Sequence, residues 1–305
     1  MYANEILANT IQKIDGAYAP SSIRAYKANF ERYISFCDSI SESALPSASE
    51  TVAKYIQKLT ANNLKSASIR LATAAISTIH KLNQLPDPTQ QPAAKLELRR
   101  MHRSLGRTSK QALGITAQIM EKMILATKND LHGLRDKALI LLAYDSLCRR
   151  SELVSIRLDD VECDDTGMPT HIHLRKSKTD QEAIGRVIRI SSSTQESIAN
   201  WIKCLKDKDG FLFRGVGNHG GITDKLSPGQ INRIYKKLAK LANIPKNKIK
   251  NISGHSIRVG ATQDLLLSGA SLPILMNKGR WTKPDTAMRY AENAGLSSAS
   301  RLFEH

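Results

Sequence analysis

The sequence predicts a mainly α-helical protein with one small β-hairpin, built as a helical N-terminal domain followed by a mixed α/β domain. Three observations lead to this fold class. The first hundred residues carry apolar side chains at helical spacing, a later segment alternates like paired strands, and a basic stretch that breaks the helical pattern lies between them. At 305 residues the chain is long enough for two domains.

The N-terminal domain, placed at residues 1–105, is expected to be all helical. Ile23 and Phe30 belong to one apolar stripe, Ser47 and Glu50 stand in capping-box register, and Pro86 stops a third helix. The helical segments are "SSIRAYKANFERYISFCDSI", "SASETVAKYIQKLTANN", "KSASIRLATAAISTIHKLNQLP" and "AAKLELRRMHRSL".

A basic linker is expected at residues 106–113. No acidic residue occurs between Leu98 and Met120, and the helical pattern breaks near Gly106. Two interpretations stay open: the linker follows a phosphate backbone, or it is a flexible tether without defined contacts.

The second domain, placed at residues 114–305, is expected to be mixed. "GLRDKALILLAYDSLC" is apolar enough for a buried helix. "HIHLRKSKTDQEAIGRVIRIS" alternates around Ile172 and Leu174, turns through polar residues and returns through Val187 and Ile190, as a hairpin does. Helices follow to the end of the chain, where "SSASRLFEH" predicts a short amphipathic tail helix.

Charge points to a polyanionic partner. Forty-five Lys and Arg against 28 Asp and Glu give a net charge of +17, with 15 basic and 8 acidic residues in 1–110 and 30 and 20 in the remainder. Basic excess in both domains favours nucleic acid over a merely soluble basic protein. Apolar runs of membrane-spanning length and a secretory leader are missing, and the four cysteines lack zinc-ligand spacing, so an intracellular protein without a structural metal is expected.

Three short motifs carry candidate chemistry. In "SGHSIRVG", Ser253 is expected to cap a helix on which His255 and Arg258 lie one turn apart and offer donors to phosphate oxygens. In "SLCRRSEL", Arg149 leaves an apolar segment three residues before Glu152. Either pair taken alone is also compatible with an ordinary surface or structural pairing.

The hairpin tip and the segment "GRWTKPDTAMRYAENAG" add the remaining candidates. Lys178 on a turn could donate a proton, although a lone lysine is more often a solvated charge. Trp281 has an indole N–H that can only donate, and Tyr290 is a candidate nucleophile. A tyrosine needs cationic neighbours for this role, because an ordinary phenol has a pKa of about 10.

Together these motifs resemble the tyrosine recombinase (phage integrase) family. The resemblance rests on "SGHSIRVGA", "SLPILM", "GRWT" with a tyrosine nine residues after the tryptophan, and "LCRRSELVSIRLDDV" upstream. It covers nearly the whole chain and is most specific at the C-terminal motif. Two departures matter: two arginines follow "SLC", of which Arg149 is chosen by its spacing to Glu152, and both Lys176 and Lys178 occupy the hairpin turn.

The resemblance implies a two-domain DNA clamp of C shape, with a core-binding helical domain and a catalytic domain. It implies that Tyr290 attacks a DNA phosphate whose oxygens are held by Arg149 and Arg258. His255 and Trp281 would donate further hydrogen bonds to this phosphate. Lys178 would be the general acid, and Glu152 would hold the arginine and histidine side in position. The product is a 3′-phosphotyrosyl link, and strands are exchanged between two recognition sites through a Holliday junction without ATP, metal or other cofactor. The candidate DNA-binding residues are Arg24, Lys27, Lys65, Arg70, Arg99, Arg100, Arg103 and Arg107.

The family also implies partners and a location. Double-stranded DNA with an inverted-repeat site and a homotetramer are expected, in which the tail with Leu302 and Phe303 docks on a neighbouring protomer. A tail folded on its own domain is the alternative. We expect the protein to act in the bacterial cytoplasm on DNA. A type IB topoisomerase and a DNA-binding relative without catalysis are the competing functions.

Overall fold

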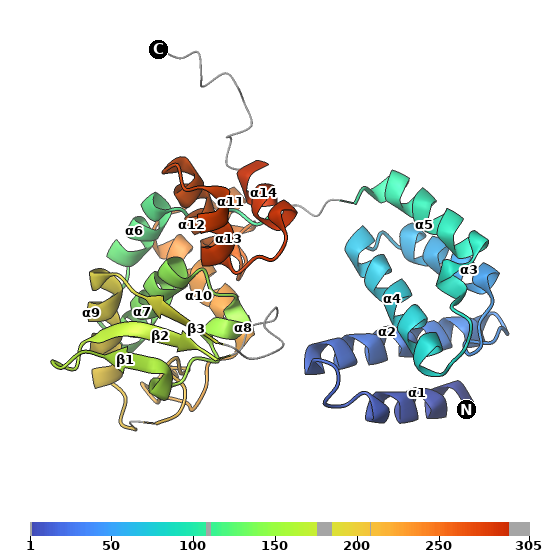
Figure 1. Ribbon diagram of the computed structural model, residues 1–305, viewed down its shortest axis with the longest axis horizontal. Helices are drawn as coiled ribbons and strands as arrows, with labels where there is room; N and C mark the ends of the chain where they lie inside the picture. Colours follow the sequence, from blue (N-terminus) through green and yellow to red (C-terminus); the bar gives the residue numbers. More distant parts are fainter. Residues whose placement is uncertain (1, 108–110, 176–184, 208, 293–305) are drawn as a thin grey trace, which may run out of the picture. The chain divides into compact units, whose positions relative to one another are not determined.

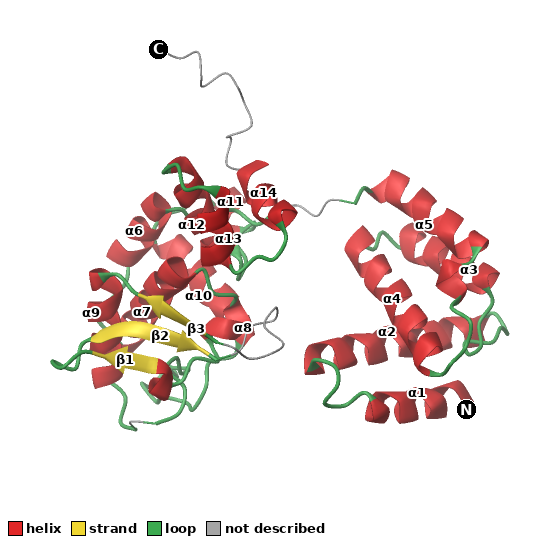
Figure 2. Ribbon diagram, in the orientation of Figure 1, coloured by secondary structure: helices red, strands yellow, loops and turns green. Residues whose placement is uncertain are grey.

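The computed structural model describes residues 2–107, 111–175, 185–207 and 209–292. The chain divides into two compact units, Met1–Lys110 and Gln111–His305 (Figure 1). Helices dominate both units and a small sheet lies in the second, which confirms the predicted fold class (Figure 2).

The first unit is entirely helical in its described residues. Helix α2 packs on α4 and α3 packs on α5 around a core that contains Phe30, Tyr33 and Ile76. These apolar side chains recur every three or four residues, so that each helix buries one stripe. The elements are α1 (Tyr2–Lys13), α2 (Pro20–Ser39), α3 (Ser49–Ala61), α4 (Ser66–Leu82), the 3-10 helix η1 (Pro88–Gln90) and α5 (Pro92–Leu105).

The capping box expected at the start of α3 is wrong. The helix begins at Ser49, its N-cap Ala48 provides no side-chain bond, and the Ser47 hydroxyl bonds the hydroxyl of Tyr33. The backbone N–H of Ser47 donates to Nε2 of His80 at 3.1 Å. Tertiary partners therefore outcompete the local cap.

The second unit packs its helices around one large core. Trp201, Phe213 and Tyr235 are among its largest buried side chains, and α7 lies in this core along most of its length. Leu113 already donates its N–H to the carbonyl oxygen of Asn251 at 3.0 Å, within this unit. The helices are α6 (Ala117–Leu125), α7 (Leu131–Ser146), α8 (Arg150–Leu153), η2 (Leu158–Asp160), α9 (Ser192–Lys203), α10 (Pro228–Leu241), α11 (Lys246–Ile249), α12 (Ser256–Leu267), α13 (Leu272–Gly279) and α14 (Pro284–Glu292).

The sheet consists of three antiparallel strands in the order β1-β2-β3 (Figure 2). Strands β2 (Pro169–Leu174) and β3 (Arg186–Arg189) form the predicted hairpin, in which Ile172 pairs with Ile188. The short strand β1 (Val161–Cys163) adds an edge that the sequence pattern does not reveal. Helix α9 contacts β2, so the buried Ile172 and Leu174 face the core.

Helices α12, α13 and α14 contact one another (Figure 1). Arg258 lies on α12, Tyr290 on α14, and Trp281 between α13 and α14. Leu275, Trp281 and Ala287 make a separate small cluster there. Gly260 lets α12 approach the segment before α6, because a methyl group at this position would lie 2.0 Å from the carbonyl oxygen of Ile115.

Candidate active site

Arg258 lies on the first turn of α12, and only 3% of it is exposed. Its Nη1 donates to the carbonyl oxygen of Leu147 at 2.5 Å, and its Nη2 donates to the carbonyl oxygen of Gly279. A guanidinium has five N–H donors in a rigid fork, so two fixed bonds hold the fork while the other hydrogens can still donate to a ligand. Burial, and then the charge of Arg149, lower the pKa of Arg258.

Arg149 and Glu152 meet at the start of α8, as their spacing predicts. Arg149 is the residue just before the helix, and its Nη1 lies 2.6 Å from Oε1 of Glu152. The backbone N–H of Arg149 donates to Oε2 of the same carboxylate at 2.9 Å. Burial acts to raise the pKa of Glu152, but this amide and the guanidiniums of Arg280 and Arg149 together hold that pKa below its usual value. Glu152 is therefore an anion that fixes Arg149.

Trp281 and Tyr290 stack beside Arg258. The two ring centroids are 5.0 Å apart with an interplanar angle of 26°, and the guanidinium carbon of Arg258 lies 5.0 Å from the centroid of the Trp281 ring. Trp281 is buried, whereas Tyr290 on α14 is only half-buried and can be reached by solvent. The charge of an ionised Tyr290 would raise the pKa of Arg258, which reflects the proximity of these two groups. The indole of Trp281 thus contacts both a cation and a phenol.

His255 lies near the arginines but not inside the helix that the sequence predicts for it. Helix α12 begins at Ser256, with His255 as its N-cap residue, so the expected cap by Ser253 is wrong. The Ser253 hydroxyl instead accepts the backbone N–H of His255 at 3.1 Å. Partial burial lowers the pKa of His255, and the charges of Arg258, Arg150 and Arg149 lower it further. A neutral imidazole, which carries one donor and one acceptor, is the form this environment favours.

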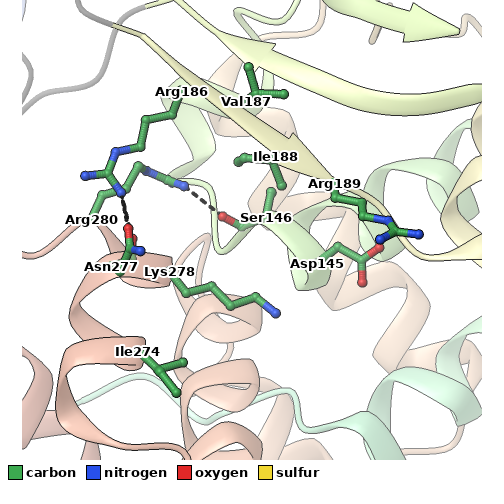
Figure 3. Close-up of a pocket in the computed structure, with 10 residues that line it drawn as sticks. All are labelled: Asp145, Ser146, Arg186, Val187, Ile188, Arg189, Ile274, Asn277, Lys278 and Arg280. Atoms are coloured by element: carbon green, nitrogen blue, oxygen red, sulfur yellow. Dashed lines mark hydrogen bonds between the residues drawn. The ribbon is translucent and has the colours of Figure 1, made fainter.

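Arg280 is a site residue that the sequence reasoning missed. It follows α13 in the left-handed conformation, at φ 53°, and only 8% of it is exposed. Its guanidinium donates to the carbonyl oxygen of Ser146 at 2.9 Å (Figure 3). It also donates to Oε2 of Glu152 at 2.8 Å. Glycine is the usual residue at such a helix end, and an arginine there has a conformational cost of about 1–2 kcal/mol. An arginine between Gly279 and Trp281 at a helix end was the available signal.

Lys178, its alternative Lys176, and the tail with Leu302 and Phe303 lie outside the described residues. The two strands on either side of these lysines are described: β2 ends at Leu174 and β3 begins at Arg186. In the second unit, Arg149 contacts Glu152, and Arg258, Trp281 and Tyr290 form a second group. The two groups are close enough that the charges of Arg149 and Glu152 affect the pKa values of Arg258 and His255.

The candidate DNA-binding residues of the first unit are exposed side chains on α2, α4, α5 and their ends. Arg70 and Arg107 are close enough to His102 that their charges, after burial, lower the pKa of that histidine. Arg100 is paired with Glu97 at 2.9 Å, and Lys27 lies 3.9 Å from Glu31. The exposed residues are Arg24, Lys27, Lys65, Arg70, Arg99, Arg100, Arg103 and Arg107.

The described residues contain no group of three or more His, Cys, Asp or Glu side chains placed to hold a metal ion. Among the same residues, helices with the length and apolar character needed to cross a membrane do not occur.

Comparisons with known proteins agree with the geometry. Residues 114–295 match the model of the phage integrase family. Recombinase Cre of Escherichia phage P1 is 27% identical over 277 residues, which cover 85% of this chain and 80% of Cre. The XerD integrase/recombinase homologue of Selenomonas ruminantium is 25% identical over 305 residues, 95% of this chain and 87% of the relative.

A solved structure shows the same fold. The XerH site-specific recombinase, in a post-cleavage complex with its palindromic difH substrate, superposes with a TM-score of 0.66 at 15% identity and covers 93% of this chain and 80% of XerH. The chain belongs to the phage integrase family, and the named relatives identify it as a site-specific tyrosine recombinase.

Proposed function

We propose that this enzyme cuts and rejoins DNA at two recognition sites through a covalent 3′-phosphotyrosyl intermediate. The Tyr290 oxygen attacks the scissile phosphorus, the bond from phosphorus to the 5′-oxygen breaks, and the released 5′-hydroxyl of the partner duplex later attacks the phosphotyrosine. One phosphoester is exchanged for another of similar energy, so the reaction needs no ATP. Two such exchanges pass through a Holliday junction.

The observation that carries the proposal is the convergence of Arg258, Trp281 and Tyr290 in one stack, with ring-to-ring and cation-to-ring separations of 5.0 Å. Arg149 and Arg258 would hold the two non-bridging oxygens, on which charge builds up in the transition state. Donors fixed before the reaction are usually the largest catalytic contribution. Because arginines supply this positive charge, the proposed chemistry has no step that requires a metal ion.

The remaining candidates have supporting roles. The N–H groups of His255 and Trp281 would add donors to the phosphate, and Glu152 would keep Arg149 oriented, as its two hydrogen bonds to that residue support. Lys178 is proposed to protonate the departing 5′-oxygen, with Lys176 as the alternative. Separate Lys176→Ala and Lys178→Ala variants distinguish them, since a 5′-bridging phosphorothioate, whose thiolate leaves without a proton, rescues only the loss of the general acid.

The partner is proposed to be duplex DNA that carries an inverted-repeat site, bound on one side by the basic helices of the first unit and on the other by the catalytic unit. A net charge of +17 supports such an interface. Four protomers would assemble on two sites, each with its tail docked on a neighbour. The proposed place of action is the bacterial cytoplasm, where such DNA lies.

A nicked suicide substrate tests the chemistry. The short strand beyond the cleavage point diffuses away, so the wild type should accumulate a protein–DNA adduct that resists denaturation, and Tyr290→Phe should form none while still binding DNA. An adduct with the phenylalanine variant, or none with the wild type on its cognate site, would refute the proposal. Two differently labelled duplexes then separate recombination from topoisomerase-like relaxation, because only a recombinase joins the two labels.

A further inference from the structure

We infer that Arg280 is a positioning residue that shares the carboxylate of Glu152, so that the positive charge of Arg149 stays available to the scissile phosphate. The inference rests on the proposed roles of Arg149 and Arg258. It concerns a residue that lies immediately before Trp281 and that makes no proposed contact with DNA.

The contacts of Arg280 show what it holds. Its Nη2 donates to Oε2 of Glu152 at 2.8 Å, on the carboxylate whose other oxygen, Oε1, accepts Nη1 of Arg149 at 2.6 Å. Both partners are almost fully buried, with 6% and 4% of their side chains exposed. A buried ion pair of this geometry is strongly coupled, because little water remains to screen it.

The charge balance explains why a second guanidinium is useful. A single carboxylate bonded to Arg149 alone would cancel that arginine's charge where the phosphate must bind. With Arg280 on the same carboxylate, two cations share one anion and the group keeps a net positive charge. The field of this group extends toward Arg258, whose pKa the charges of both Arg149 and Arg280 lower.

Arg280 also connects the chain segments that carry the site. It donates to the carbonyl oxygen of Ser146 at 2.9 Å (Figure 3) and to that of Leu147 at 3.3 Å, where α7 ends and the turn toward α8 begins. Arg258 donates to the same Leu147 oxygen. The two arginines therefore fasten the end of α13, and with it Trp281, to the turn that leads into Arg149.

The first test compares Arg280→Met with Lys278→Met on the suicide substrate. Both variants remove one cation and introduce the same side chain, but Lys278 is an exposed residue two positions earlier on α13. Arg280→Met should cleave about 10- to 100-fold more slowly, a loss of the size known for residues that orient the ligands of metal sites without touching the metal. Lys278→Met should cleave at the wild-type rate, and DNA affinity should be similar in both variants.

The pH profile separates positioning from a general loss of structure. The titratable and charged groups that face Glu152 are Arg149, Arg280, Arg258, His255 and Cys148. Without Arg280, one of the groups that lower the pKa of Glu152 is lost, so that this carboxylate takes up a proton at a higher pH. Cleavage by Arg280→Met should therefore fall off on the acid side at a higher pH than in the wild type. A variant that is merely less stable loses activity without this shift.

A double-mutant cycle with Glu152→Gln completes the test. If Arg280 acts through Glu152, adding Arg280→Met to Glu152→Gln should cost little beyond Glu152→Gln alone, and Arg280→Lys, which keeps the charge, should retain the wild-type acid limb. Multiplicative losses in the cycle, or an unshifted acid limb in Arg280→Met, would overturn the inference.

Arg280→Gln takes the place of the methionine variant if thermal unfolding shows that the latter does not fold. The Tyr290→Phe control separates the two failures: an adduct in that control refutes the proposed function, whereas its absence together with wild-type cleavage by Arg280→Met refutes only this inference.

Discussion

Replacing Arg258 with lysine should nearly abolish cleavage while the protein still binds DNA. Lysine keeps the charge but concentrates its donors on one atom, which cannot bond the Leu147 and Gly279 carbonyl oxygens and also reach a phosphate. Loss of one fixed donor to a developing oxyanion costs about 10²–10³ in rate. Since the rigid fork is lost as a whole, we expect a decrease at the upper end of this range or beyond it. Arg258→Met, which also removes the charge, should be slower still.

DNA affinity should change far less. Loss of one phosphate contact lowers the number of counterions released on DNA binding by about 0.9. Near physiological salt this corresponds to about a fivefold loss of affinity. Single-turnover adduct formation on the suicide substrate gives the rate, and fluorescence anisotropy with a labelled duplex gives the affinity. If Arg258→Lys lost both in proportion, Arg258 would be a general DNA anchor or a structural residue, and the clamp mechanism would be refuted.

Three further outcomes follow from the charges and packing. The affinity for DNA should fall by roughly 10³-fold between about 50 and 200 mM salt, as measured by anisotropy, and a flat response would contradict the basic interface. The pKa of His255 should lie below 6.5 in the free protein, because partial burial and neighbouring arginines lower it, and a bound phosphate should raise it again. NMR spectra of the imidazole measure both pKa values, and a value at or above 6.5 in the free protein would contradict this prediction. Gly260→Ala should lower the free energy of unfolding by about 1–3 kcal/mol through its clash with Ile115, whereas Gly221→Ala, where nothing lies within 4 Å, should change it by less than about 0.5 kcal/mol in thermal melts.

Periodic patterns were enough to predict the helical framework and the hairpin. Alternation around Ile172 and Leu174 predicted the hairpin but not its register: Ile172 pairs with Ile188, whereas Val187, which was expected on the returning strand, pairs with His173 and is exposed. Strand β1 has only three residues, which is too short for a pattern. Side-chain caps were predicted less well. The hydroxyl of Ser47 bonds the hydroxyl of Tyr33, on another helix, instead of capping the helix that follows it.

In the candidate site, too, some contacts can be predicted from local spacing and others depend on the tertiary fold. Arg149 and Glu152 lie three apart and meet within a single turn, so their contact could be predicted from spacing. Arg280 reaches Glu152 across 128 positions of the chain, and no local pattern encodes such a contact. Likewise, the stack of Arg258 on Trp281 depends on how α12 packs against α13 and α14.

The most direct measurement identifies the atoms that are joined in the trapped adduct. After digestion with protease and nuclease, mass spectrometry should find a nucleotide attached through its 3′-phosphate to the peptide that contains Tyr290, and the released strand should carry a free 5′-hydroxyl. Attachment to another residue would contradict the assignment of Tyr290 as the nucleophile, and attachment through a 5′-phosphate would contradict the proposed 3′-phosphotyrosyl link.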